Sequence, residues 1–406
     1  MCKVSQNEAT REFVCRHREA DVRQLALQGG RDPEVDLSFA LEQIAGWQKA
    51  RTKIPSWAAV EGILYPPHLS MEQCSSEQTA RYKAEIAGEG NLFVDLTSGF
   101  GVDAAFISQG FTKAVCVEQQ EGLNALSSEN FQRLGLTHIQ TVCGDGTDYL
   151  HTMPHADLIF IDPARRDAHG GRAYGIADCT PNVLEMMDEM KTKADRILIK
   201  LSPMLDWRKA VDDIGVGVSS VHIVSVDNEC KELMVEVRKL KGEKVRIVCV
   251  NLHDDTREVF EFFTPSPFHP LTPSPSHLFT FSPLHLFTFL YSPNASIMKA
   301  GCFDLISERF GVSQLDKNSH LFVSDTEVTD FPGRRFVIDK IITMNKRELK
   351  EALTGISRAN IAVRNFPMSV AELRKRLRLQ EGGDVFIFAT TVANQGHRLF
   401  VCRKIS

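Results

Sequence analysis

Acidic side chains and a glycine turn follow apolar runs in one stretch of the sequence. Asp95 ends the first run, and Thr97, Gly99 and Gly101 come directly after it, while Glu118 ends the second run. Glycine lets the backbone approach a ligand closely. An acid about 20 residues beyond such a turn accepts hydrogen bonds from ribose hydroxyls in nucleotide-binding folds. The pattern predicts a nucleotide-like ligand at the ends of two neighbouring parallel strands, where Asp95 could also accept from an ammonium group.

Two more acids follow the third and fourth apolar runs. Asp145, followed by Gly146, comes after the run 139–143 and is a candidate acceptor for an adenine amino group. Asp162-Pro163 ends the fourth run. A carboxylate and a carbonyl at this position can accept hydrogen bonds from a target amine and align its lone pair for in-line group transfer. Each acid alone is equally compatible with a helix cap or a turn.

In this order and at these spacings, the four elements resemble the layout of S-adenosylmethionine-dependent methyltransferases. The turn is Gly-x-Gly without a third glycine, which departs from the NAD-binding pattern and favours a methyltransferase over a dehydrogenase. The resemblance implies S-adenosylmethionine as cofactor, with Asp162 and Pro163 as the catalytic pair. It also implies the cofactor-binding residues Asp95, Thr97, Gly99, Gly101, Glu118, Asp145 and Gly146.

Alternating strand and helix patterns between residues 89 and 250 predict the sheet that positions these residues. The fold class expected is α/β, with a seven-stranded, doubly wound Rossmann-like sheet completed by strands at 196–201, 221–226 and 233–237. Residues 1–88 are expected to be helical, with Asp36 as the N-cap of a helix from Leu37 to Ala50. Beyond residue 335 we expect a small α+β unit with strands at 337–343 and 360–363, helices at 346–354 and 369–379, and a hairpin at 385–392 and 398–403.

The composition is that of a globular protein, with 43% hydrophobic and 24% charged residues. No apolar run approaches the length of a membrane span, and no secretory signal is evident, so we expect a cytoplasmic protein without a membrane partner. The ten cysteines form no Cys-x-x-Cys pair. This spacing argues against a metal site or a disulfide scaffold and favours reduced thiols.

The net charge of −5 is unevenly distributed. Residues 336–406 contain 13 lysines and arginines against 6 aspartates and glutamates, a net charge of +7 that leaves −12 for residues 1–335. A basic segment attached to an acidic one suggests a polyanionic partner. Arg374, Lys375 and Arg376 put cations on one predicted helix and are candidate phosphate contacts. A solvated basic face is the alternative.

Residues 266–289 contain an internal repeat of eight residues with His269, His277 and His285 in register. No acids or thiols accompany these histidines, and three octads match no solenoid period. We therefore interpret residues 264–290 as a low-complexity insertion rather than a metal array.

Longer segments resemble a bacterial family of class I methyltransferases that carry a C-terminal THUMP-like domain. They include Gln73 to Lys83, Lys200 to Asp206, Asp227 to Glu232, Phe331 to Arg334 and Arg364 to Pro367. After the helical region that the sequence pattern predicts at 1–88, the resemblance implies a methyltransferase domain at 89–250, a ferredoxin-like segment at 291–335 and a THUMP-like domain at 336–406. THUMP domains in general occur in tRNA-modifying enzymes, so RNA, either tRNA or rRNA, is the implied substrate class.

The sequence departs from one pattern of amine-methylating enzymes. Those usually have a second proline and an aromatic residue after the acid-proline pair, whereas Ala164 and Arg165 stand here. No aromatic residue is available at that position to stack on a flipped base, so ring nitrogen and carbon targets stay open. A carbon target would call for a cysteine nucleophile, for which Cys179 and Cys230 are the candidates.

Arginines close to the predicted catalytic pair could contact the phosphates of a nucleic acid. Arg165 and Arg166 follow Asp162-Pro163, and Arg172 lies in the glycine-rich segment 169–175. Two other functions remain open. One is a non-catalytic RNA-binding protein on a methyltransferase fold, and the other is a methyltransferase acting on protein or a small molecule. The sequence does not indicate the methylated atom or the oligomeric state.

Overall fold

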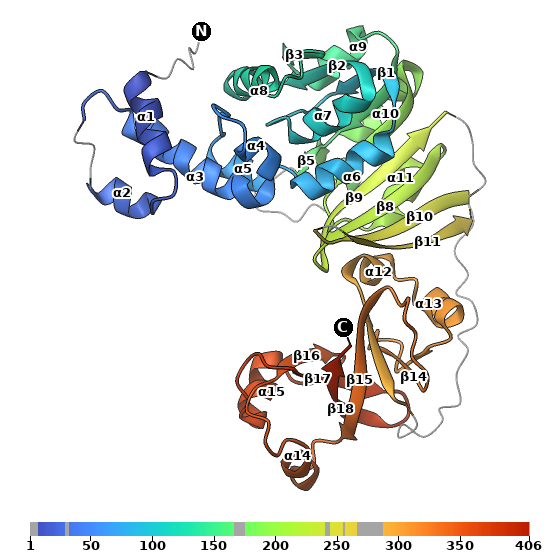
Figure 1. Ribbon diagram of the computed structural model, residues 1–406. Coiled ribbons are helices and arrows are strands. Elements are labelled where there is room, and N and C mark those ends of the chain that lie inside the picture. Colours follow the sequence, from blue (N-terminus) through green and yellow to red (C-terminus); the bar gives the residue numbers. More distant parts are fainter. Residues whose placement is uncertain are drawn as a thin grey trace. The chain divides into compact units, whose positions relative to one another are not determined.

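The computed structural model describes residues 7–28, 32–165, 175–239, 244–254, 256–265 and 287–405 (Figure 1). These residues fall into two compact units. The first contains the described residues up to 226 together with those of 231–247 and 263–265. The second contains 227–230, the described residues of 248–262, and those from 287 onward. The octad repeat lies outside the described residues except for its last three positions.

The first unit begins with helices, as the sequence predicts. They are α1 (Glu8–His17), α2 (Val22–Gln28), α3 (Leu37–Lys53), α4 (Pro55–Ala58), α5 (His68–Gln73) and α6 (Glu77–Ala87). Asp36 caps α3 by accepting a hydrogen bond from the Phe39 backbone N–H at 3.1 Å, which confirms the predicted start of this helix. Ser76 caps α6 in the same way. None of the helices in the described part of the chain is both long and apolar enough to cross a membrane.

A parallel sheet follows, built from apolar runs that are buried because helices cover the sheet. Its parallel strands are β1 (Gly90–Asp95), β2 (Phe111–Glu118), β3 (Ile139–Cys143), β4 (Ala156–Ile161) and β7 (Ala194–Leu201). The connecting helices are α7 (Val102–Ile107), α8 (Glu121–Arg133), α9 (Gly146–Thr152), α10 (Val183–Lys193) and α11 (Trp207–Ile214), with short 3₁₀ turns η1 (Ser108–Gly110) and η2 (Ile176–Asp178). In register, Asp95 pairs with Cys116 on one side and with Phe160 on the other. The carboxyl ends of β1, β2 and β4 therefore meet at one edge of the sheet.

The sheet is larger than the seven strands that the sequence predicts. Its order is β11-β10-β8-β9-β7-β4-β1-β2-β3, with β9 (Glu229–Arg238) running antiparallel to β7. The additional strands are β10 (Lys244–Leu252) and β11 (Arg257–Pro265), which follow β8 (Val218–Val226) in the order. β10 carries a run of six buried residues at its end. The prediction ended the methyltransferase domain at residue 250, within this run. In the structure the run is part of β10, and the sheet continues into β11. A separate two-stranded sheet pairs β5 (Ala164–Arg165) with β6 (Cys179–Thr180).

The second unit holds a seven-stranded sheet of order β13-β14-β12-β15-β18-β17-β16. The strands are β12 (Phe289–Pro293), β13 (Ser313–Gln314), β14 (Phe322–Ser324), β15 (Gly333–Ile342), β16 (Asn360–Arg364), β17 (Val385–Val392) and β18 (Gly396–Lys404). The helices are α12 (Ala295–Ala300), α13 (Phe303–Phe310), α14 (Lys346–Ala352) and α15 (Val370–Leu377). The order and type of the elements beyond residue 335 agree with the sequence-based prediction.

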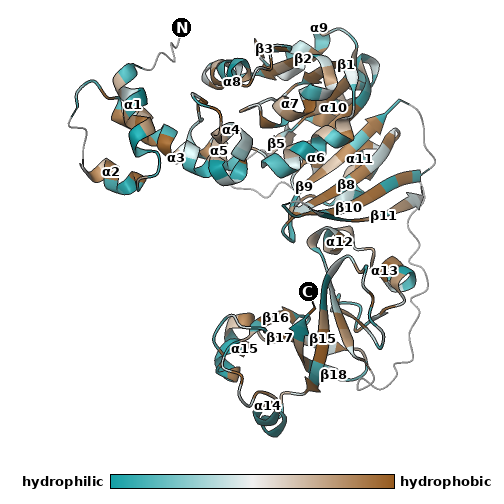
Figure 2. Ribbon diagram, in the orientation of Figure 1, coloured by the Kyte–Doolittle hydropathy of each residue, from teal (hydrophilic) through white to brown (hydrophobic). Residues whose placement is uncertain are grey.

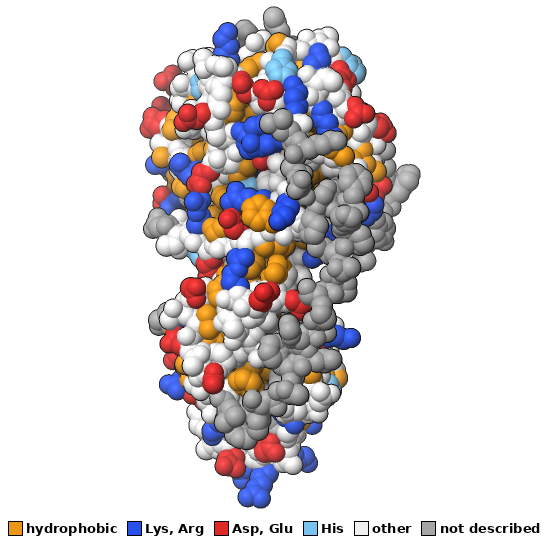
Figure 3. Space-filling view, turned by 90° about the vertical axis from the view of Figure 1, so that its right-hand side faces the viewer, with side chains coloured by type: hydrophobic (Ala, Val, Ile, Leu, Met, Phe, Trp, Pro, Cys, Tyr) orange, Lys and Arg blue, Asp and Glu red, His pale blue; other side chains and the backbone are white. Residues whose placement is uncertain are grey.

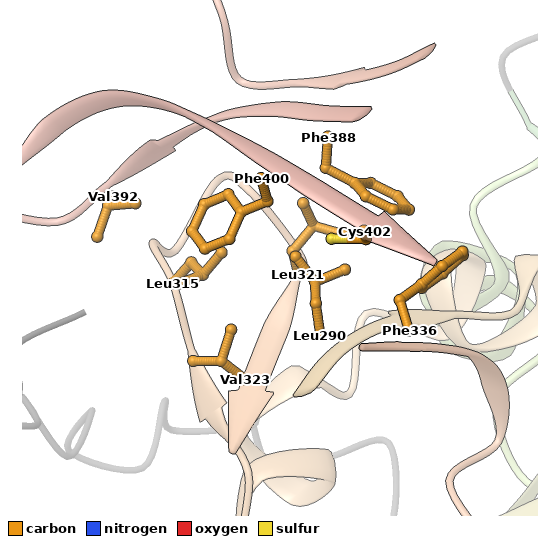
Figure 4. Packing of buried hydrophobic residues seen from close by; sticks show 9 residues of the cluster. All are labelled: Leu290, Leu315, Leu321, Val323, Phe336, Phe388, Val392, Phe400 and Cys402. Carbon is orange, nitrogen blue, oxygen red and sulfur yellow. The ribbon is translucent and has the colours of Figure 1, made fainter. Parts of the chain in front are cut away.

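Strands distant in sequence share one core in this second unit. Phe336, Phe388 and Phe400 pack together from β15, β17 and β18 (Figure 4). Leu290 of β12 and Leu321 complete the same cluster. Figure 2 shows the hydrophobic residues along the strands, whereas α14 is mostly hydrophilic. The ferredoxin-like segment and the residues after it are therefore joined by packing as well as by strand pairing.

Candidate active site

Asp95 lies buried at the end of β1, where the chain enters the glycine turn. Its carboxylate Oδ1 accepts a hydrogen bond from the Thr97 backbone N–H at 2.9 Å, and the residue is only 1% exposed. Burial raises the pKa of Asp95 well above its usual range, and the carboxylates of Asp103 and Asp162 raise it further. These surroundings disfavour the charged form of Asp95 relative to an exposed aspartate, and a cationic ligand beside it would act in the opposite direction.

Glu118, at the end of β2, ties the glycine turn to the second strand. Its Oε2 accepts from the Gly99 backbone N–H at 3.0 Å, and its Oε1 accepts from the Gln120 N–H at 2.8 Å. Gly99 and Gly101 have φ of +54° and +86°. A Cβ on Gly101 would lie 2.5 Å from the Phe131 ring, so this position needs glycine for both conformation and space. The turn and the acid meet as the sequence predicts.

Asp162 lies beside the same turn at the end of β4. Its backbone N–H donates to Thr97 Oγ1 at 2.7 Å. Its carboxylate Oδ2 accepts from Lys200 Nζ at 2.6 Å, and the Asp162 side chain keeps 38% exposure. Pro163 is buried next to it. One oxygen of Asp162 is therefore held by a lysine while the side chain stays accessible to a second molecule.

Lys200 belongs to a charged network that the sequence analysis did not assign. Besides Asp162, its Nζ contacts Ser75 Oγ at 3.1 Å and Asp103 Oδ2 at 3.3 Å. Burial disfavours the charged lysine, but Asp162, Asp103 and Glu232 outweigh this and raise the pKa of Lys200 well above its usual range. The network holds Lys200 protonated at any physiological pH.

Lys83, on α6, lies at the centre of the same network and is fully buried. Its Nζ is 2.7 Å from both carboxylate oxygens of Glu232, 3.1 Å from Asp103 Oδ1 and 3.0 Å from Ser75 Oγ. Together with the contact between Lys200 and Asp103, these contacts join α6, α7, β7 and β9 across up to 149 residues of sequence. The sequence contains one signal for this network. Lys200 is a charged residue inside the otherwise apolar segment 197–201.

Asp145 and Gly146 take more local roles. Asp145 caps α9, with its Oδ1 accepting from the Thr147 N–H at 2.7 Å, and its side chain is exposed. A Cβ on Gly146 would lie 2.1 Å from the Leu96 carbonyl oxygen. The third strand end thus packs directly against the turn that carries Asp95 and Thr97, and the Asp145 carboxylate keeps free lone pairs for a ligand.

The predicted arginine contacts near Asp162 cannot be placed. Arg165 is described only by its backbone, in β5, while Arg166 and Arg172 lie outside the described residues. Cys179 is buried opposite Arg165 in the β5–β6 pair, and Cys230 is half-buried on β9. Among the described residues, no group of three or more His, Cys, Asp or Glu side chains could hold a metal ion.

The three cations of α15 differ from one another. Arg374 Nη1 donates to the Ala359 carbonyl oxygen at 3.0 Å, and its side chain is only 21% exposed. Lys375 and Arg376 are exposed. Arg374 therefore holds its own domain together, whereas the other two are available at the surface.

A Rossmann-like sheet with these strand-end acids defines a class I methyltransferase fold. Residues 289–332 match the model of a ferredoxin-like domain, and residues 333–404 match that of a THUMP domain-like family. A crystal structure from Porphyromonas gingivalis, described as a "putative methyltransferase", is 30% identical with a TM-score of 0.83, covering 98% of each chain. The chain therefore belongs to the family of class I S-adenosylmethionine-dependent methyltransferases with a C-terminal THUMP-like domain.

More distant structures resemble only part of the chain. TrmK of M. capricolum, in complex with S-adenosyl-homocysteine, is 12% identical with a TM-score of 0.32 and covers 44% of this chain and 70% of that one. An rRNA methylase from Streptococcus thermophilus is 17% identical with a TM-score of 0.30 and covers 40% of this chain and 96% of that one. No curated protein matches the chain.

Proposed function

We propose that the protein transfers a methyl group from S-adenosylmethionine to RNA, either tRNA or rRNA. The observation that carries this proposal is the position of Asp162. It lies at the end of β4, is linked to the glycine turn through Thr97 and is anchored by Lys200, yet remains accessible. A carboxylate fixed beside a nucleotide-binding turn is suited to orient an acceptor group.

The residues at the turn fit S-adenosylmethionine. Ser98 Oγ is buried and has no hydrogen-bond partner among the described residues, and the space that a side chain on Gly99 would take is open. Each Glu118 oxygen accepts one N–H, which leaves lone pairs for ribose hydroxyls. Asp95 and the Gly146 backbone complete the set of candidate contacts, with Asp145 as acceptor for the adenine amino group.

The bound cofactor would supply an electrophilic methyl group on a sulfonium. The protein's own contribution is alignment. Asp162 Oδ1 and the carbonyl of Pro163 accept hydrogen bonds from the target and direct its lone pair, while Lys200 fixes the carboxylate through Oδ2. The lysine, in turn, is fixed by Asp103 and Ser75. Alignment of this kind lowers the barrier because the orientation is established before the reaction.

The THUMP-like match and the charge of the C-terminal segment support RNA as the substrate. Residues 336–406 carry a net charge of +7, and Lys375 and Arg376 expose cations there. Basic surfaces bind polyphosphate chains with an affinity that falls steeply with salt. Residues 336–406 would then deliver RNA, and residues 89–250 would carry out the transfer in the cytoplasm.

Label transfer tests this proposal. Purified full-length protein is incubated with tritiated-methyl S-adenosylmethionine and, separately, with total RNA, total protein or a small-metabolite extract. The proposal predicts label in RNA, followed by identification of the nucleotide by digestion and mass spectrometry. Label only in protein or metabolites would contradict RNA as substrate, and cofactor binding without any label would contradict catalysis.

A further inference from the structure

Arg334 and Arg364 are two arginines of the second unit that form no ion pair with a described acidic residue, unlike Arg335 and Arg403. Arg335 lies 2.9 Å from Glu327, and Arg403 lies 2.7 Å from Asp339. Arg334, at the start of β15, and Arg364, at the end of β16, have no carboxylate within 4.0 Å among the described residues. Both belong to segments that resemble the family, but neither was assigned a role from the sequence.

The two side chains start from strands that approach one helix. Arg334 is in register with Ser292 of β12, two residues before Asn294, the N-cap of α12. Arg364 Nη1 lies 3.8 Å from Sδ of Met298 on α12. A thioether is a weak acceptor, and a guanidinium has five N–H donors. The hydrogen-bonding capacity of Arg364 is therefore largely unused by the described part of the protein.

Both guanidinium groups have lowered pKa values. Desolvation lowers the pKa of both guanidinium groups, and the charge of Arg334 lowers the pKa of Arg364 further. Like charges that approach in partly desolvated surroundings repel each other. An oxyanion between them would replace this repulsion with attraction. On the face shown in Figure 3, basic and acidic side chains are interspersed.

A third polar group near Arg364 also lacks a partner. His320 stacks on Phe303 with ring centroids 4.1 Å apart, and its Nδ1 is buried without a hydrogen-bond partner among the described residues. Burial lowers the pKa of His320, and the charge of Arg364 lowers it further, although Asp316 acts in the opposite direction. A neutral imidazole can still donate one N–H. Asp316 Oδ1 already accepts from Asn365 Nδ2 at 3.1 Å.

We infer that Arg334 and Arg364, with His320 beside them, form a binding site for a phosphate group of the RNA chain. Arginine forks bind phosphate oxygens through paired, charge-assisted hydrogen bonds, which are the strong ones in proteins. This inference rests on the proposed function and places the main RNA contact here rather than on α15. Arg334 is exposed and Arg364 is half-buried, so both guanidiniums are accessible to an anion.

The test uses the full-length protein, fluorescein-labelled bulk bacterial tRNA and fluorescence anisotropy at several KCl concentrations. The pair variant carries Arg334→Gln and Arg364→Gln. The matched control carries Lys346→Gln and Arg347→Gln, which remove the same charge from exposed positions of α14. We expect the pair variant to bind about tenfold or more weakly, with a salt slope reduced by about 1. The control should stay within about threefold of the wild type.

Two further measurements extend the test. One distinguishes free phosphate from the phosphate of RNA, and the other asks whether the guanidinium groups are needed or positive charge alone is enough. Inorganic phosphate should displace tRNA from the wild type more effectively than KCl of equal ionic strength, and this difference should disappear in the pair variant. Arg334→Lys with Arg364→Lys keeps the charge but not the fork, so its affinity should fall between wild type and the glutamine pair. Unchanged circular dichroism and melting temperature show that each variant is folded.

Equal losses in the pair variant and the control would overturn the inference, because the effect would then be one of net charge. Absence of tRNA binding by the wild type would also overturn it, even if inorganic phosphate bound. Label transfer to RNA that is unaffected by the pair variant would overturn the inference and leave the proposed function standing. tRNA binding that depends on Arg334 and Arg364, without any label transfer, would support the inference and contradict the proposed function.

Discussion

The two units of the chain balance their cations in different ways. In the first unit, Lys83 and Lys200 are enclosed by Asp103, Asp162 and Glu232 at distances of 2.6–3.3 Å. In the second unit, Arg334 and Arg364 have no such acids among the described residues. A buried lysine with its own carboxylates belongs to the folded framework, whereas an arginine pair without them keeps its hydrogen-bond donors for an anion from outside. We therefore expect the lysine network to position the proposed chemistry and the arginine pair to contact the proposed substrate.

The largest expected effect comes from breaking the internal pairing. Lys83→Met leaves Glu232 buried without its ion-pair partner, whereas Asp103 keeps Lys200, and we expect it to lower the free energy of unfolding by about 3–5 kcal/mol. Urea denaturation of the full-length protein measures this change in the free energy of unfolding. Lys209→Met is the matched control, because Lys209 forms an exposed pair with Asp213 at 2.8 Å, and it should change little. Equal effects of the two substitutions would contradict a structural role for Lys83.

Substitution of Asp162, the accessible carboxylate that pairs with Lys200, should affect catalysis instead of folding. Asp162→Ala removes the acceptor that orients the target, and we expect methyl transfer to fall by about a hundredfold or more. Binding of S-adenosylhomocysteine, measured by calorimetry, should persist within about threefold. Asp162→Asn, which keeps one acceptor oxygen, should retain more activity than the alanine variant. An unchanged turnover in Asp162→Ala would rule out the proposed alignment.

Asp95 offers a pH-dependent comparison. Because its pKa is raised in the folded state, Asp95 contributes stability below the unfolded value of about 4, and this contribution is lost as the pH rises through the folded pKa. Asp95→Asn removes this titration and keeps an acceptor for the Thr97 N–H. We expect the variant to gain on the wild type by up to about 1.4 kcal/mol per pH unit above pH 4 within that window. Thermal unfolding of the wild type and Asp95→Asn at a series of pH values measures this difference. Stability curves of the two proteins that run parallel over this range would contradict a raised pKa of Asp95.

The smallest effect separates two neighbours on α15. Arg374→Met loses the hydrogen bond to the Ala359 carbonyl, and we expect it to destabilise the second unit by about 1 kcal/mol. Lys375→Met, at an exposed position, should leave stability unchanged and weaken RNA binding slightly at low salt. Thermal melts and anisotropy measured on both variants distinguish these outcomes. A larger loss of RNA affinity in Arg374→Met than in Lys375→Met, without destabilisation, would make Arg374 a ligand contact.

The strand-end residues are the part of the candidate site whose positions the sequence could predict. Asp95, Glu118 and Asp162 each end an apolar run, and parallel strands bring their carboxyl ends to the same edge. Local patterns of this kind also predicted the helix beginning at Asp36 and most elements beyond residue 335. The family resemblance extended this to the THUMP-like fold.

The charged network and the arginine pair depend on contacts that no local pattern contains. Lys83 and Glu232 are 149 residues apart, and only the positions of α6 and β9 against the sheet bring them together. The strands β10 and β11 were missed because an apolar run does not show which sheet edge it joins. The distinction between Arg374 and Lys375 likewise depends on one carbonyl group, that of Ala359, which another segment supplies.

We propose that the turn formed by Asp95, Gly99 and Glu118 binds S-adenosylmethionine. Isothermal titration of the full-length protein with S-adenosylmethionine and S-adenosylhomocysteine tests it most directly, with Glu118→Ala as the comparison variant. The account predicts saturable binding of one ligand per chain, weakened by at least about tenfold in Glu118→Ala, which loses the ribose acceptor and the Gly99 contact. No heat of binding with either ligand would contradict the claim and favour a non-catalytic RNA-binding protein.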